Sequence, residues 1–241
     1  MDNNQNSDLN ARAKNAFCAV IPAYQEAASV GEIVRRAREF VPAVFVVDDG
    51  STDGTAREAA SAGAEVLSHD RNRGKGVAIN TGFQHARARG FHIVITLDAD
   101  GQHDPSDIPR FIDAYVRTGI PVIVGNRIAH SAAIPFLRRN VNRITSHLLS
   151  RQMGQYLPDT QCGFRLYRCD VIPFVSAKSE RYAAESEILL HVAARDIRMD
   201  SLPITVVPKR GGNHAHPFLD AVRFFLMLAR YRSRHGWRRD P

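Results

Sequence analysis

Five short runs of apolar residues, each separated from the next by a segment with helical spacing, constrain the fold of this chain most strongly. The runs lie in residues 17–22, 43–50, 64–69, 92–98 and 121–127, and the helical segments in 28–40, 54–62, 74–90 and 105–119. Apolar strands that alternate with helices form mostly parallel sheets, because the crossover helices cover both faces of the sheet. The pattern therefore predicts an α/β fold with a central sheet flanked by helices.

Polar residues follow or end four of these apolar runs. They are residues 24–26, 48–51, 98–103 and 126–127. Ligands of parallel sheets bind beyond the carboxyl ends of the strands, where these four clusters meet. We therefore expect a binding site at that edge of the sheet.

The second half of the chain is less regular, but no repeat or clear linker separates it from the first half. Helices are expected over residues 136–153 and 183–196, and short strands within 159–168 and 199–210. We divide the chain into a disordered polar tail (1–15), one domain (16–217), and an amphipathic C-terminal helix with a basic tail (218–241).

The net charge of +7 indicates a polyanionic partner: nucleic acid, anionic lipid headgroups or phosphorylated small molecules. A nucleic-acid-binding module is disfavoured, because acidic residues gather at the expected binding edge. In addition, no pattern of stacking aromatic residues accompanies the basic ones. The charge therefore fits a phosphorylated ligand or a lipid surface better.

The cysteines and the apolar segments suggest where the chain works. Cys18, Cys162 and Cys169 are too scattered for a disulfide framework or a zinc site, which favours a reducing, cytoplasmic location. The N-terminus lacks the apolar core of a signal peptide, and no apolar run reaches the roughly 18 residues of a membrane span.

The C-terminal helix has an apolar face followed by arginines. Such a helix fits peripheral contact with an anionic membrane, and core packing or a dimer contact are the alternatives. The apolar residues are Phe218, Ala221, Val222, Phe225, Leu226, Leu228 and Ala229.

Two carboxylates stand two positions apart after the fourth apolar run. On an extended strand, Asp98 and Asp100 would point the same way and repel each other unless a cation lay between them. Mg²⁺ or Mn²⁺ fits, because hard cations take oxygen ligands and share them with substrate phosphates. Gln102 or His103 would complete the shell. The alternative is ordinary turn chemistry, with an Asp capping the helix that starts at Pro105.

Two other polar segments suggest ligand contacts. Asp49, in "VVDDGSTDGT", is suited to accept hydrogen bonds from a base or a ribose. Lys75, in "RNRGKG", starts a helix and is suited to face an anion, although the spacing is not that of a P-loop. A solvated turn is the alternative for this second segment.

The chain resembles a known enzyme family through an ordered set of motifs. They are "VIPAYQE", "VVDDGSTDGT", "RNRGKGVAINTG", "LDADGQH", "GNR", "CGFRLYR" and "ESE", and they cover about residues 17–218. The set is similar to the inverting family 2 glycosyltransferases of the GT-A fold. Within them, it resembles most the dolichol- or polyprenyl-phosphate mannosyltransferases. The resemblance implies a Rossmann-like nucleotide-diphospho-sugar transferase fold for the domain.

The resemblance also implies site residues. Asp98, Asp100 and Gln102 would hold the metal, and Asp98, Asp100 and Arg210 would be catalytic. The nucleotide-sugar site would comprise Pro22, Tyr24, Glu26, Asp49, Lys75, Asp98, Ala99, Asp100, Arg127, Arg210 and His216. The acceptor side would comprise Arg127, Arg139, Arg165, Glu185 and Glu187. Structural ion pairing is the alternative for Arg139 and Arg165. For Glu185 and Glu187, the alternative is that they complement the dipole at the N-terminus of their helix. One departure is His216, which stands where the family often has a lysine.

The implied activity is metal-dependent, inverting transfer of a hexose to polyprenyl or dolichyl phosphate, with GDP-mannose as the expected donor. The alternative is transfer of glucose or N-acetylglucosamine from a UDP-linked donor to a lipid or saccharide acceptor. A nucleotidyltransferase would also fit an acidic pair on an α/β sheet, but the sequence has no glycine-rich triphosphate loop. A lipid phosphate acceptor is already anionic near pH 7, so it needs positioning by arginines more than a general base.

Overall fold

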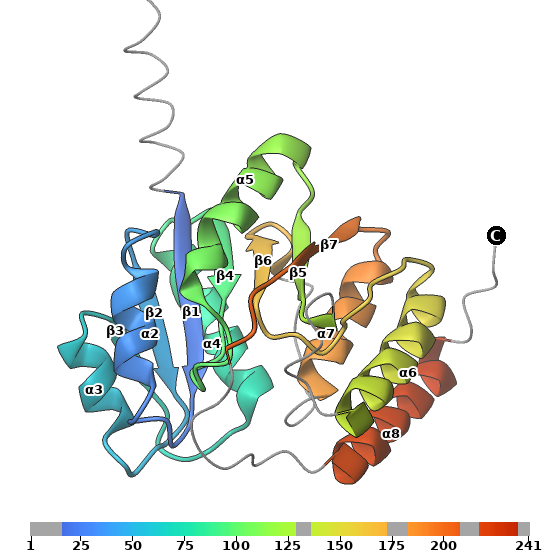
Figure 1. The fold of residues 1–241 in the computed structure, drawn as a ribbon, viewed down its shortest axis with the longest axis horizontal. Coiled ribbons are helices and arrows are strands. Elements are labelled where there is room, and N and C mark those ends of the chain that lie inside the picture. Colours follow the sequence, from blue (N-terminus) through green and yellow to red (C-terminus); the bar gives the residue numbers. More distant parts are fainter. Residues whose placement is uncertain (1–15, 129–135, 173–182, 208–216, 236–241) are drawn as a thin grey trace, which may run out of the picture.

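The structure is a computed structural model that describes residues 16–128, 136–172, 183–207 and 217–235. Its centre is a seven-stranded sheet with the order β3-β2-β1-β4-β6-β5-β7 (Figure 1). All neighbouring strands are parallel except β6, which runs antiparallel to both β4 and β5. The strands are β1 (Phe17–Ala23), β2 (Val44–Asp48), β3 (Glu65–Ser68), β4 (Ile93–Thr96), β5 (Val122–Asn126), β6 (Arg165–Arg168) and β7 (Met199–Pro203).

Helices cover both faces of this sheet. In Figure 1, α2, α3 and α5 lie on one face and α4 on the other, while α6, α7 and α8 form a group beside the second half of the sheet. The helices are α2 (Val30–Ala37), α3 (Thr55–Ser61), α4 (Lys75–Ala88), α5 (Ile108–Thr118), α6 (Phe136–Met153), α7 (Ala183–Ala193) and α8 (Pro217–His235), with a short 3-10 turn η1 (Pro105–Asp107). The predicted α/β architecture with a mostly parallel sheet is confirmed.

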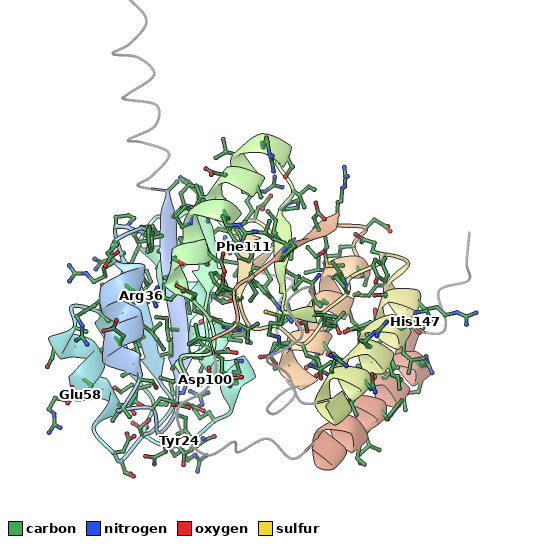
Figure 2. All side chains as sticks on the ribbon, viewed as in Figure 1. Tyr24, Arg36, Glu58, Asp100, Phe111 and His147 are labelled. Carbon is green, nitrogen blue, oxygen red and sulfur yellow. The ribbon has the colours of Figure 1, made fainter. Side chains whose placement is uncertain are left out.

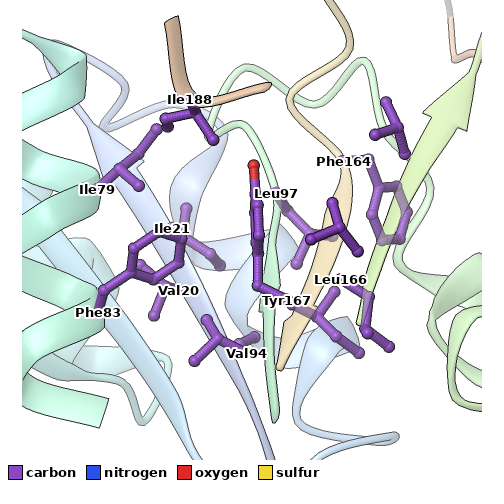
Figure 3. Packing of buried hydrophobic residues seen from close by; sticks show 14 of the residues in the cluster. Val20, Ile21, Ile79, Phe83, Val94, Leu97, Phe164, Leu166, Tyr167 and Ile188 are labelled. Carbon is purple, nitrogen blue, oxygen red and sulfur yellow. The ribbon is translucent and has the colours of Figure 1, made fainter. Parts of the chain in front are cut away.

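The central strands are buried on both faces, as their near-continuous apolar sequences require. Every residue of β1, β2 and β4 is buried. Figure 3 shows one part of this core, where Phe83 of α4 lies beside Val20 of β1. Phe83 also makes an edge-to-face contact with Tyr167 of β6, with ring centroids 5.1 Å apart. The core thus joins the first and second halves of the chain.

The C-terminal helix packs on the core by one face and exposes apolar residues on the other. α8 contacts α6 and α7, and Phe224, Met227 and Leu228 are buried. By contrast, Val222, Phe225 and Leu226 are 41%, 48% and 54% exposed. Of the predicted apolar face, Leu228 packs on the core, whereas Val222, Phe225 and Leu226 face solvent. No helix among the described residues is long and apolar enough to cross a membrane.

Gly82 is where α4 approaches the sheet most closely. A Cβ at this position would lie 2.3 Å from Cγ1 of Val20 and 3.2 Å from Cγ2 of Val47. Both valines are fully buried in adjacent strands, so neither can move without disturbing the sheet. A glycine at this helical position therefore lets α4 lie directly on β1.

We expect Gly82→Ala to lower the free energy of unfolding by about 1–3 kcal/mol, because overpacking outweighs the roughly 1 kcal/mol gain in helix propensity. Gly31→Ala in α2 is the matched control, since its nearest heavy atoms would be 3.5 Å away. That variant should be neutral or slightly stabilised. Urea unfolding monitored by circular dichroism gives both values. Equal stabilities of the two variants would contradict the close-packing interpretation.

Candidate active site

The loops after β1, β2 and β4 are joined to each other at one edge of the sheet. The backbone N–H of Gln25 donates to Ser51 Oγ (2.9 Å), and the Ser29 hydroxyl donates to the Ala99 carbonyl (2.6 Å). Figure 2 shows Tyr24 and Asp100 at this edge. The predicted clusters at residues 24–26, 48–51 and 98–103 therefore do meet.

Asp98 and Asp100 lie in the turn that follows β4, because that strand already ends at Thr96. The expectation that they lie on an extended strand with their side chains on the same face is therefore wrong. The backbone N–H of Gln102 donates to Asp100 Oδ1 (3.1 Å), and the Gln102 side-chain amide donates to the other carboxylate oxygen. The helix-capping role belongs to Asp104, which accepts from the Ser106 N–H at 2.9 Å. Asp98 and Asp100 are thus not used as helix caps.

Asp98 forms an ion pair with a lysine at the start of helix α4. Lys75 Nζ lies 2.5 Å from Asp98 Oδ1 and 2.5 Å from Glu185 Oε1. Burial would raise the pKa of Asp98, but the charge and the hydrogen bond of Lys75 hold it well below its usual value. The carboxyl is therefore ionised at neutral pH.

His103 supports Asp98 from the interior. Its side chain is 1% exposed, and its Nδ1 accepts the backbone N–H of Asp98 at 3.3 Å. Since Nδ1 accepts, the proton is assigned to Nε2, which faces Cys162 Sγ at 3.8 Å. Burial lowers the pKa of this imidazole, although the charge of Asp98 opposes the shift. A neutral imidazole thus fixes the backbone of the acidic turn.

The chemistry of the acidic turn fits a divalent cation that is shared with a ligand. Asp98, Asp100 and Gln102 offer only oxygen ligands to a metal, and both carboxylates are partly exposed. Among the described residues, no group of three or more His, Cys, Asp or Glu side chains could hold a metal by itself. Mg²⁺ commonly binds through one or two carboxylates plus substrate phosphates, so two acids are sufficient when a diphosphate is present.

The carboxylate of Asp49 forms hydrogen bonds within the protein. It accepts hydrogen bonds from the backbone N–H groups of Arg73 (2.9 Å) and Gly74 (2.8 Å), and contacts His69 Nδ1 at 2.6 Å. These bonds hold the "RNRGKG" loop and so place Lys75 at the first position of α4. The predicted contact of Asp49 with a nucleoside remains a prediction.

Two arginines of the predicted site form internal contacts. Arg127 donates twice to the buried Asp159 carboxylate, at 2.7 and 2.9 Å. Burial would raise the pKa of Asp159, but the charge and hydrogen bonds of Arg127 lower it below its usual value. Arg165 is 1% exposed, and its guanidinium donates to three backbone carbonyls, including that of Glu185. The geometry favours structural ion pairing and hydrogen bonding for both arginines.

The other predicted residues differ in their exposure to solvent. Tyr24 is 46% exposed, and Pro22 and Ala99 are buried. Glu26 and Arg139 are half-buried, and Glu187 lies 3.8 Å from His191 Nε2. Arg210 and His216 lie outside the described residues.

Sequence reasoning missed Gly163 as part of the site. A Cβ on Gly163 would lie 2.3 Å from Asp98 Oδ1, so any larger residue would displace the carboxylate. The only signal was the glycine of "CGFRLYR", whose approach to Asp98 depends on the antiparallel pairing of β6 with β4. The buried position of His103 was equally hidden in the sequence.

Comparisons with known proteins give a consistent result. Residues 18–173 match the family described as Glycosyl transferase family 2. The undecaprenyl-phosphate mannosyltransferase of Micrococcus luteus is 32% identical over 205 residues, which cover 80% of this chain and 84% of that protein.

Solved structures share the fold at lower identity. Mannosyl-3-phosphoglycerate synthase from Rubrobacter xylanophilus has a TM-score of 0.74 and 21% identity, and the match covers 94% of this chain and 78% of that one. Glucosyl-3-phosphoglycerate synthase from Mycobacterium tuberculosis, in complex with Mn²⁺, UDP and glucosyl-3-phosphoglycerate, has a TM-score of 0.69 and 21% identity, with 95% and 83% covered. The predicted GT-A fold is confirmed.

We expect Asp159→Asn to destabilise the protein by about 3–5 kcal/mol at pH 7, because it leaves the Arg127 charge buried without a partner. Asp170→Asn is the matched control: its pair with Arg168 is also bidentate (2.7 Å twice) but exposed, and should contribute less than about 1 kcal/mol. Urea unfolding measures both values. Similar losses in the two variants would contradict a buried ion pair.

The same pair should make stability depend on acid. The pKa of Asp159 is lower in the folded state, so its contribution is complete above the unfolded value of about 3.9 and is lost as pH falls below it. Unfolding free energies measured between pH 5 and 3 should therefore decrease more steeply for the wild type than for Asp159→Asn. Parallel pH profiles would contradict this assignment.

Proposed function

Because the chain belongs to glycosyl transferase family 2 and is a glycosyltransferase, we propose that it moves mannose from GDP-mannose to a polyprenyl phosphate. The observation that carries the proposal is the partly exposed acidic turn of Asp98 and Asp100, with the ammonium of Lys75 beside it. This arrangement suits a nucleoside diphosphate that shares a divalent cation with the turn. The choice of mannose and of a lipid phosphate is supported by the M. luteus relative.

Asp98, Asp100 and Gln102 would hold the cation, which is Mg²⁺ or Mn²⁺. When bound, the cation neutralises charge on the diphosphate as the bond between sugar and phosphate breaks. The chain itself contributes Lys75, a fixed positive charge at the same edge of the sheet. A preorganised charge of this kind stabilises a developing anion without reorganisation at the moment of reaction. His103 and Gly163 maintain the position of the Asp98 carboxylate.

The acceptor need not be deprotonated by the protein. The second pKa of a phosphate monoester is about 6, so a polyprenyl phosphate is already anionic and nucleophilic near pH 7. Glu185, an acid of the predicted acceptor set, is 2% exposed and is not accessible as a base. A lipid phosphate therefore fits this site better than a sugar hydroxyl, which would require a base within reach.

A pocket beside the same edge supports an amphipathic acceptor. It has a volume of about 460 Å³, and one of its lining residues is Ile128, which follows Arg127 just beyond the end of β5. Its walls combine apolar side chains and Tyr156 with Arg143 and His147 of α6. Figure 2 labels His147 on this helix. An isoprenoid chain with a phosphate head has matching chemistry. The exposed apolar residues of α8 support peripheral contact with the membrane that carries such a lipid, on its cytoplasmic face.

The alternative donor is a UDP-linked glucose or N-acetylglucosamine. The structure of the M. tuberculosis synthase in complex with Mn²⁺ and UDP supports it, since that protein has the same fold. The two donors differ in the base and the sugar, so a binding panel distinguishes them directly.

We expect GDP-mannose with Mn²⁺ to raise the melting temperature by about 5–10 °C at concentrations near 100 Kd. Asp100→Asn should lose the Mn²⁺-dependent part of this shift because it removes a metal ligand. Asp113→Asn, an exposed change in α5, is the control and should respond like the wild type. Differential scanning fluorimetry with GDP- and UDP-sugars, with and without Mn²⁺, provides the measurement.

Transfer is checked with a radiolabelled sugar and undecaprenyl phosphate, followed by extraction into organic solvent. Labelled lipid from GDP-mannose supports the proposal, and labelled lipid from a UDP-sugar alone supports the alternative donor. If no nucleotide sugar stabilises the protein and no label reaches the lipid, the proposed function is wrong.

A further inference from the structure

Glu185 is a buried carboxylate at the start of α7. Its side chain is 2% exposed, and neither of its oxygens accepts a hydrogen bond of good geometry among the described residues. Its close contact is with Lys75, whose Nζ lies 2.5 Å from Oε1. A buried carboxylate without a positive partner is costly, so Glu185 depends on this ammonium.

Lys75 is shared between two carboxylates that differ in exposure. Its Nζ is 2.5 Å from Glu185 Oε1 on the inner side and 2.5 Å from Asp98 Oδ1, whose side chain is 23% exposed, on the outer side. Two carboxylates at these distances favour the charged form of the lysine. The group is therefore a permanent cation beside the acidic turn.

The packing of two helices fixes this arrangement. Lys75 is the first residue of α4, and Glu185 lies in the first turn of α7. The two helices contact each other, and Figure 3 shows Ile79 of α4 and Ile188 of α7 on the same side of the core. Both isoleucines are buried one turn beyond the ion pair, so the position of Lys75 does not depend on Asp98 alone.

We infer that Glu185 is a positioning residue, which holds Lys75 as an internal cation that competes with a divalent metal for Asp98. This inference rests on the proposed function. Before the donor arrives, Lys75 satisfies Asp98, so a metal alone binds weakly. If Asp98 binds a metal that is shared with a nucleoside diphosphate, Lys75 loses its contact with Asp98. The ion pair with Glu185 would then hold Lys75 at the edge of the sheet, beside the diphosphate. Glu185 therefore acts through Lys75 and not on the acceptor.

This inference gives opposite effects for two variants. In Glu185→Gln, Lys75 keeps Asp98 but loses the second of these two carboxylates. Lys75 then competes more strongly with the metal for Asp98, and Mn²⁺ affinity should fall at least threefold. In the double variant Lys75→Met/Glu185→Gln, both the competing cation and the buried acid are removed. Asp98 is then free, and Mn²⁺ affinity should rise at least tenfold. A purely structural Glu185 would leave the Mn²⁺ affinity of Glu185→Gln at the wild-type value.

The measurement is Mn²⁺ binding to the full chain by electron paramagnetic resonance, with and without GDP. Lys75→Arg is the conservative control, since it keeps the cation, and should bind Mn²⁺ like the wild type. Melting temperatures identify any variant that does not fold. Lys75→Met alone should be the least stable, because it leaves Glu185 buried and unpaired, and the double variant should recover stability. If Glu185→Gln does not fold, the double variant decides the test.

The outcomes separate the two proposals. If the wild type shows no Mn²⁺ binding that Asp98→Asn abolishes, with or without GDP, the proposed function fails and the inference fails with it. If that binding is present but the double variant is not tighter than the wild type, or Glu185→Gln is not weaker, only the inference is overturned. Opposite shifts in the two variants establish it.

Discussion

The site depends on one ion-pair network, in which a single lysine compensates two carboxylates at one edge of the sheet. Asp98 and Glu185 are 87 positions apart in sequence, and both contact the ammonium of Lys75 at 2.5 Å. This one cation joins the turn after β4, the start of α4 and the start of α7. Each of these elements is held by its own packing, so the ion pairs are not flexible surface contacts. Removing the cation would leave one carboxylate buried without compensation, which is among the costliest changes in a protein interior.

The antiparallel strand β6 brings the second half of the chain to this edge. It lies between β4 and β5, and the segment that leads into it places Gly163 against Asp98. Thr96 Oγ1 donates to the Gly163 carbonyl at 2.7 Å, which fixes the approach. On the same strand, the buried Arg165 donates to the Glu185 carbonyl at 2.9 Å. One strand thus positions both acids that Lys75 contacts.

The sequence predicted the local features of this architecture well and the long-range contacts poorly. Apolar runs and helical spacing identified the strands and helices up to residue 127, because burial on one or both faces dictates those periods. The polar clusters at strand ends were likewise recognisable. The pairing of Lys75 with Glu185, or of Arg127 with Asp159, was not, because contacts between distant residues leave no periodic signal. Even the turn of Asp98 and Asp100 was misplaced on a strand, since the residue at which a strand ends depends on its hydrogen-bonded neighbours and not on local propensity.

The insertion of β6 has a consequence for how the chain is made. During synthesis, β4 emerges about 70 residues before β6, so the nascent sheet presents β4 as an open edge. Unpaired strand edges invite association with other chains. The open edge of β4 is therefore covered only after β6 has been synthesised. Lys75 likewise obtains its second carboxylate only after Glu185 has been synthesised. Both the sheet and the ion pairs of Lys75 are thus completed by the second half of the chain.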